Sequence, residues 1–195
     1  MPYRPEPPAN PPGVSDYTRP TLSIPQEIMD TNANEQEQLI VEWEAAGLIP
    51  VFDPQVRAFH EAAHVLCAIR LGFQVVSVDI IRRILPSGSD PLVGKIIYGT
   101  CRTSPSPANT ERDRMLVDLA GGIGEAIFTG VPAVGDVGDT HLYEGGPSKA
   151  DLEAVTKIVQ DSWDAISEIA RLLLENTALD GATVREIIVK HSTIA

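Results

Sequence analysis

The sequence predicts a mainly α-helical fold of the α+β class, with a small β-hairpin or sheet beside a central helix. Three observations carry this prediction. Apolar residues recur with a period of 3.6 in several segments, two segments begin at good helix caps, and one β-branched stretch lies between them. The length of 195 residues accommodates one domain, or one domain with a tail.

Helices are predicted wherever a cap precedes a periodic apolar pattern. Asp53 is a good N-cap followed by Pro54 at the first helical position, and Gly72 can end the helix that follows. Thr110 begins a capping box that is closed by Asp113 rather than by a glutamate. The predicted helices span residues 34–46, 54–71, 110–128, 148–176 and 183–190.

The β element is predicted between the second and third helices. Val75–Ile84 and Val93–Tyr98 are rich in β-branched residues, and turn-forming residues fill Pro86–Pro91 between them. The two strands are expected to pair as a hairpin with a loop of six or more residues. Gly130–Pro147 holds five glycines and two prolines and is predicted to be a long loop, of the kind that is often functional.

The first 33 residues differ from the rest of the chain. Eight of the 16 prolines lie within the first 25 residues, and residues 1–50 carry half of the net charge of −12. Proline removes backbone donors and this stretch has little to bury, so 1–33 is predicted to be a disordered tail ahead of a domain at 34–195. Removing the tail would test whether it is a tether, a cleft cover, a docking segment or only a solvated leader.

Composition and charge narrow the function and the location. An acidic chain disfavours nucleic-acid binding, because phosphate backbones attract basic surfaces. No secretory signal and no uncharged apolar run of 18 residues is present, so no membrane span and a cytoplasmic location are expected. Two cysteines, Cys67 and Cys101, are too few for a disulfide scaffold and fit a reducing compartment.

The most informative motif is His60-Glu61-x-x-His64 on the predicted helix at 54–71. Residues four apart lie on one helix face, so both imidazoles can reach one zinc ion, with Glu61 beside its open position. Glu61 could then act as catalytic base toward a zinc-bound water. By composition alone about 0.006 such motifs are expected in this chain.

A catalytic zinc usually takes a third protein ligand, and the residues alone leave its identity open. Glu125 lies mid-helix in a glycine-rich stretch that would let two helices approach closely. Asp151 lies in a first helical turn, where an ordinary capping acid is also expected. His141 ranks third because it falls in the long loop. The downstream candidates are Glu125, His141, Glu144, Asp151 and Glu153.

Four segments, in consistent order, resemble the peptidase domain of the FtsH-type zinc metalloproteases. Phe59–Leu66 resembles that family's zinc helix, YHEAGHALV, and Asp118–Gly130 resembles its LxGGRxAEExIFG helix. Ser148–Val155 resembles the GASNDLExAT segment, and Leu172–Ile188 resembles the C-terminal region with its L-D-G turn. The resemblance spans about residues 57–188 and is more specific than the zinc motif alone.

The resemblance implies a zincin-like helical domain with Zn²⁺ as cofactor and a role for each motif residue. His60, His64 and Asp151 would be the ligands, Glu61 the catalytic base, and Glu125 a supporting residue rather than the alternative ligand. The implied activity is a zinc metalloendopeptidase that hydrolyses peptide bonds through zinc-bound water. The implied substrates are polypeptides, above all unfolded ones.

The sequence also departs from this family. No P-loop of an AAA ATPase and no transmembrane segment is present, Ala63 replaces the motif glycine, and Ile123 replaces the arginine after the glycine pair. ATP-driven unfolding is therefore not implied, and an ATP-independent peptidase is expected. A homo-oligomer and an ATPase partner in trans remain open, as do two other functions: a catalytically silent interaction module and a zinc amidase.

Two further segments have candidate roles. An extended substrate could add to the edge of the predicted hairpin as another strand, with a purely structural hairpin as an equal alternative. The loop at Gly130–Pro147 could likewise be a lid or a plain connector.

Overall fold

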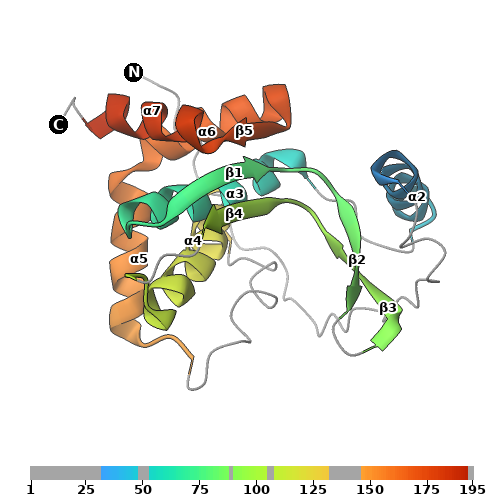
Figure 1. Ribbon diagram of the computed structural model, residues 1–195, viewed down its shortest axis with the longest axis horizontal. Coiled ribbons are helices and arrows are strands. Elements are labelled where there is room, and N and C mark those ends of the chain that lie inside the picture. Colours follow the sequence, from blue (N-terminus) through green and yellow to red (C-terminus); the bar gives the residue numbers. More distant parts are fainter. Residues whose placement is uncertain (1–31, 48–52, 88–89, 105–107, 132–145, 193–195) are drawn as a thin grey trace.

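The computed structural model describes residues 32–47, 53–87, 90–104, 108–131 and 146–192, and the structural statements below concern these residues. It confirms a mainly α-helical α+β fold with a small antiparallel sheet (Figure 1). The helices are α2 (Ala33–Ala45), α3 (Pro54–Arg70), α4 (Glu111–Thr129), α5 (Lys149–Asp161), α6 (Trp163–Asn176) and α7 (Gly181–Ser192). The strands are β1 (Gln74–Asp79), β2 (Arg83–Ser87), β3 (Asp90–Ile97), β4 (Thr100–Ser104) and β5 (Ala178–Asp180).

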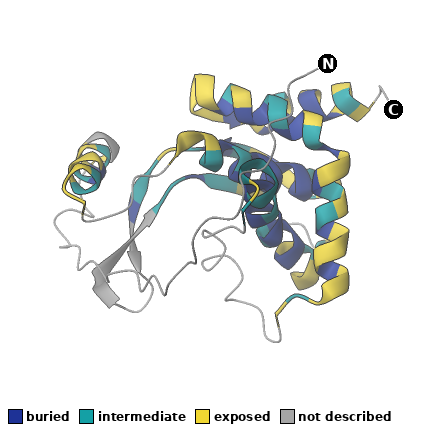
Figure 2. Cartoon of the chain, turned by 180° about the vertical axis from the view of Figure 1, so that it is seen from behind, coloured by how far each residue is buried: buried dark blue, intermediate teal, exposed yellow. Residues whose placement is uncertain are grey.

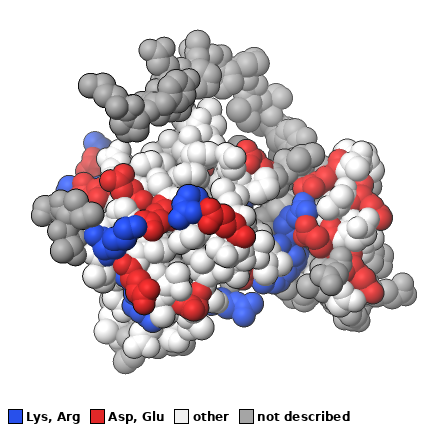
Figure 3. Space-filling view, turned by 90° about the horizontal axis from the view of Figure 1, so that it is seen from above, with Lys and Arg blue, Asp and Glu red and all other residues white. Residues whose placement is uncertain are grey.

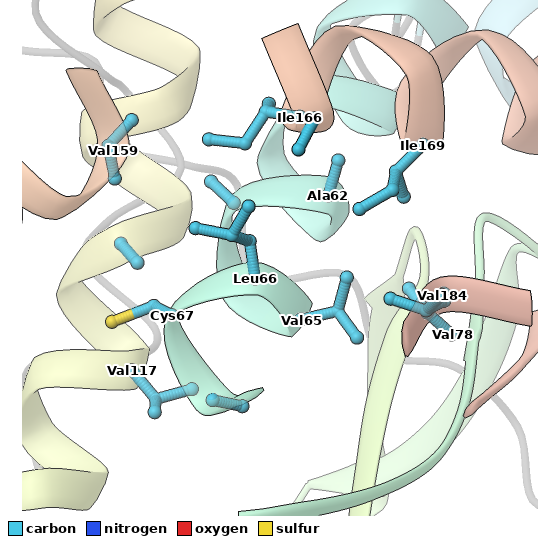
Figure 4. Packing of buried hydrophobic residues seen from close by; sticks show 14 of the residues in the cluster. Ala62, Val65, Leu66, Cys67, Val78, Val117, Val159, Ile166, Ile169 and Val184 are labelled. Carbon is cyan, nitrogen blue, oxygen red and sulfur yellow. The ribbon is translucent and has the colours of Figure 1, made fainter. Parts of the chain in front are cut away.

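Helix α3 is the centre of the molecule, and its ends are where the sequence predicts them. The Asp53 side chain caps it by accepting a hydrogen bond from the Gln55 amide, with Pro54 in the first turn. Ten of the eleven residues from Ala58 to Ala68 are buried, and Phe59 is the one that is partly exposed. Helix α4, α6 and the sheet surround α3, and Leu66 points into the cluster between them (Figure 4).

Helix α4 crosses α3 closely because small residues meet at the crossing. A Cβ added to Gly124 would lie 2.5 Å from the Ala63 Cβ and 3.1 Å from the Phe59 carbonyl oxygen. The prediction that this glycine-rich stretch allows close approach of two helices is thus confirmed. The Thr110–Asp113 capping box also forms as predicted, and Gly130 ends the helix in a left-handed conformation.

The sheet beside α3 has three antiparallel strands in the order β4-β1-β5. The sequence prediction included only the first part of this sheet, since it assigned neither β4 nor β5. Strand β5 is three residues long, and the Leu179-Asp180-Gly181 segment was expected only to turn the chain. A side chain at Gly181 would run into the Val75 carbonyl oxygen, so this junction requires glycine.

The predicted strand Val75–Ile84 is wrong as a single element. It is interrupted after Asp79, whose carboxylate accepts from the Ile81 amide and pairs through both oxygens with Arg83. These contacts bend the chain, so that β1 stays on the core while β2 pairs with β3 farther out. The loop between β2 and β3 is also shorter than predicted, because the strands run to Ser87 and resume at Asp90.

The helix predicted at 148–176 is likewise two helices, α5 and α6. No glycine or proline marks the break, and Ser162 leaves helical geometry with φ −116° and ψ 18°. The turn directs α6 over α3, where Trp163 stacks on Phe59 with ring centroids 5.2 Å apart. The break allows Ile166 and Ile169 to be buried in the cluster around α3 (Figure 4). A continuous helix would direct these residues away from α3 and lose this burial.

Helix α2 lies apart from the helical core and contacts β2 (Figures 1 and 2). The Gln36 side-chain oxygen accepts from the Ile84 amide at 3.0 Å, and Ile40 and Ile84 are both buried. Arg82 pairs with Glu37 and with Glu44, the latter at 2.8 Å. Acidic side chains cover this end of the molecule, with basic ones beside them (Figure 3). We call α2, β2 and β3 the arm.

Within the described ranges, none of the helices combines the length and the apolar character that crossing a membrane requires. The predicted tail at 1–33 lies outside the described residues except for its last two positions. Most of the predicted loop at Gly130–Pro147, including His141 and Glu144, also lies outside them.

Candidate metal centre

The two histidines of the motif meet on the face of α3 that packs against α4. Their Nε2 atoms lie 2.9 Å apart, and the rings are edge-on with centroids 4.5 Å apart. Both residues are buried, with exposed fractions of 2% for His60 and 7% for His64. The predicted convergence of the two imidazoles, one helical turn apart, is therefore present.

Helix α4 orients each ring through its other nitrogen. The Val117 carbonyl oxygen lies 2.7 Å from His64 Nδ1, and a Glu125 carboxylate oxygen lies 3.3 Å from His60 Nδ1. A carbonyl or carboxylate oxygen accepts hydrogen bonds, so the Nδ1 of each ring is placed to donate, and the two Nε2 atoms face each other. Outer partners of this kind orient metal-binding histidines in many zinc sites.

Two imidazole nitrogens are ligands of the kind that zinc takes. Zn–N bonds of about 2.0–2.1 Å at a tetrahedral angle place two nitrogens about 3.4 Å apart, half an ångström from the observed separation. Two Nε2 lone pairs at 2.9 Å repel each other unless a cation, either a metal ion or a proton, lies between or beside them. His60 and His64 would hold the zinc, with Glu125 and the Val117 carbonyl supporting them.

Gly121 is what allows α4 to reach the imidazoles. A Cβ at this position would lie 2.6 Å from His60 Nε2 and even closer to His64 Nε2. Any larger residue would therefore occupy the space in front of both lone pairs. The sequence indicates that this stretch contains small residues, but it does not indicate that Gly121 faces the motif histidines.

Glu61 is buried beside the histidines, with an exposed fraction of 2%, and its carboxylate is held by Arg57. Arg57 Nη2 lies 2.5 Å from Glu61 Oε1, one helical turn toward the N-terminus. Gly99, between β3 and β4, packs on both side chains. Sequence reasoning missed Arg57, although the four-residue spacing of an arginine and a glutamate on a predicted helix was a signal for it.

Asp151, the ligand that the resemblance implies, has Ser148 and Arg112 as its hydrogen-bond partners. Its Oδ2 accepts from the Ser148 amide and hydroxyl, and its Oδ1 accepts from Arg112 Nε at 2.8 Å. The hydrogen bonds from Ser148 and then Arg112 lower the pKa of this carboxyl below its ordinary value. Arg112 precedes Gly121 by nine residues, which at 100° per residue places it on the opposite side of α4.

The capping role expected for Asp151 is thus present, and its ligand role remains a prediction. Throughout the ranges that the structure describes, no three His, Cys, Asp or Glu side chains are grouped so as to hold a metal ion. Glu153, another candidate, is exposed on α5 and pairs with Lys149. Glu125 contacts the Nδ1 side of His60 and so lies across the ring from Nε2.

The two cysteines near this site remain neutral thiols. Burial raises the pKa of Cys101 well above its ordinary value, and the negative charges of Glu61 and Asp118 raise it further. Burial alone raises the pKa of Cys67 to about 12. Since the thiolate is the nucleophile and the metal ligand, neither cysteine is suited to either role here.

A comparison with family models finds none that matches this chain, and a comparison with curated proteins finds no match either. The FtsH-type resemblance therefore rests on the sequence motifs alone and stays a prediction.

Proposed function

We propose that this chain is a zinc metalloendopeptidase of the FtsH type that hydrolyses polypeptides independently of ATP. The observation that carries the proposal is the pair of Nε2 atoms 2.9 Å apart, each in a ring whose Nδ1 faces an acceptor. Two buried imidazoles in this orientation could hold a cation between their Nε2 atoms. The His-Glu-x-x-His spacing and the FtsH-type segments favour zinc as that cation.

The residues divide the chemistry between them. When bound, zinc would polarise the peptide carbonyl and lower the pKa of water to about 7. Glu61 takes a proton from the attacking water and delivers it to the leaving amine, so that the carboxylate is regenerated in each turnover. Glu125 keeps the proton of His60 on Nδ1, which leaves Nε2 free of a proton for ligation.

Metal content and cleavage of casein test the proposal together. The purified full chain should contain about one zinc per molecule. Casein cleavage should fall by at least about a hundredfold in Glu61→Gln, which retains the shape of the base but cannot accept the proton. A chain without zinc, or equal cleavage by both forms, would overturn the proposal.

A second measurement tests the ligand that the resemblance implies. Asp151→Asn keeps an acceptor for the Ser148 cap but removes the negative charge. If Asp151 ligates zinc, the zinc affinity should drop by about ten- to a hundredfold. If the zinc affinity is unchanged, Asp151 acts only as a helix cap. Glu125→Gln tests the other candidate ligand by the same measurement.

Substrate binding is proposed at the sheet beside α3. Within the described residues, β4 pairs with β1 alone, so an extended polypeptide could hydrogen-bond to its outer edge. Main-chain pairing of this kind shows little sequence preference, as expected for a peptidase of unfolded chains. The sequence motifs and this edge favour hydrolysis of polypeptides over the amidase and the catalytically silent alternatives.

A further inference from the structure

Glu61, the proposed base, is buried next to the guanidinium of Arg57. Arg57 Nη2 lies 2.5 Å from Glu61 Oε1, and the side chains are 16% and 2% exposed. A buried carboxylate is costly unless it is paired. Arg57 therefore supplies the positive partner that a buried carboxylate requires.

The geometry of this pair differs from that of a purely stabilising one. Arg83 donates to both oxygens of Asp79 in a bidentate ion pair, which is the strongest arrangement for an arginine and a carboxylate. Arg57 instead uses Nη2 for both Glu61 Oε1 and the Gly99 carbonyl oxygen, the latter at 3.3 Å. Its Nε is buried without a hydrogen-bond partner in the described part of the chain.

Gly99 completes the enclosure of the Glu61 side chain. A Cβ at position 99 would lie 2.9 Å from Glu61 Cγ and 3.0 Å from Arg57 Nε. The backbone between β3 and β4 thus packs directly on the stem of the base, and Arg57 ties that backbone to α3. Glu61 is thus held by the β3–β4 connection and by Arg57, which lies one turn earlier on the same helix.

We propose that Arg57 is a positioning residue for Glu61: it holds Oε1 and leaves Oε2 to exchange the proton with water and the leaving amine. The inference rests on the proposed function. The guanidinium keeps its charge throughout and transfers no proton. Its role is to fix the carboxylate in one orientation, since catalytic groups lose most of their effect when they are displaced by about an ångström.

The pairing itself can be measured without any activity, by a double-mutant cycle on the full chain. Arg57→Met should lower the thermal midpoint clearly in the wild type, because it leaves a buried carboxylate unpaired. The same change should have much less effect in a Glu61→Gln background. Arg171 and Glu175 are the matched control, since they have the same order and spacing but are 56% and 53% exposed. Absence of coupling between Arg57 and Glu61 would overturn the proposal.

The positioning role is then tested on casein cleavage and zinc affinity. Arg57→Met should bind zinc as the wild type does, yet lose about tenfold or more in kcat with KM changed by less than about threefold. Arg57→Lys, which keeps the charge, should recover part of the loss and serves if Arg57→Met does not fold. Zinc affinity should be unchanged in both variants.

The outcomes separate the two proposals. Full kcat in a folded Arg57→Met variant, or a change in KM alone, would overturn the positioning role. It would leave the zinc peptidase proposal standing. A wild type that binds no zinc and cleaves nothing would overturn the proposed function and this role with it, while the cycle would still establish the buried pair.

Discussion

The α3–α4 crossing and the arm are held together by different forces. At the crossing, small residues let the α4 backbone at Gly121 and Gly124 approach side chains of α3 such as Ala63. In the arm, α2 is held to β2 by one buried hydrogen bond, the Arg82 ion pairs and the burial of Ile40. Close apolar packing tolerates little change, whereas partly exposed polar contacts are weak and replaceable.

The candidate site therefore depends on the α3–α4 crossing, and the arm is separable from it. Each region contains one of the two tryptophans: Trp163 stacks on Phe59 in the core, and Trp43 lies in α2. Trp43→Phe therefore leaves a fluorescent probe of the core, and Trp163→Phe leaves a probe of the arm. The unfolding of each region can then be followed separately.

Gly121→Ala should be the most damaging small change. Its Cβ would overlap the space in front of both Nε2 atoms, so zinc affinity should fall by more than about a hundredfold and stability by about 1–3 kcal/mol. Gly124→Ala is the control, since it strains the same crossing against Ala63 without touching the imidazoles. It should lower stability but reduce zinc affinity much less; equal zinc affinity in Gly121→Ala and the wild type would refute the assignment.

Leu66→Ala and Ile40→Ala compare two fully buried aliphatic residues, one in each region. Leu66→Ala should cost about 2–5 kcal/mol in urea unfolding followed at Trp163. Ile40→Ala should shift the Trp43 transition and leave the Trp163 transition and the zinc affinity nearly unchanged. Equal shifts at both tryptophans would mean that arm and core unfold as one unit.

Arg82→Gln should loosen the arm by a smaller amount. Arg82 pairs with Glu37 and Glu44 at the edge of α2, and such partly exposed pairs contribute about 0.2–1 kcal/mol. Faster amide hydrogen exchange confined to α2 is the expected result, and 1 M salt should produce the same change in the wild type. Exchange that also accelerates in α3 would argue against a separable arm.

Glu168→Gln should have the smallest effect, which should be present near neutral pH and disappear in acid. Hydrogen bonds from Lys190 and then His191 lower the pKa of Glu168, which joins α6 to α7 in the core. A depressed folded pKa adds stability above the unfolded value of about 4.3, and this stability is lost as the pH falls through the folded value. The Trp163 urea midpoint of the variant should therefore fall less than that of the wild type between pH 6 and pH 3.

The helices that carry the candidate site could be predicted because their signals are local. Asp53 and Thr110 cap α3 and α4 through side chains two or three residues from the amides that they satisfy. The breaks at Asp79 and Ser162 could not be predicted. The first depends on a contact with Arg83 across a bend, and the second on Trp163 and Ile166 reaching α3.

Local sequence was enough to place His60 and His64 on one helix face, since a spacing of four residues is nearly one helical turn. It was also enough to predict the caps and the mainly helical class. Which residues face the histidine pair depends on how the helices pack. Gly121 and Glu125 reach it from α4, Arg57 turns to Glu61 and Gly99, and Asp151 turns to Arg112. These partners come from separate elements, and their approach depends on how closely the helices pack, which no local pattern specifies.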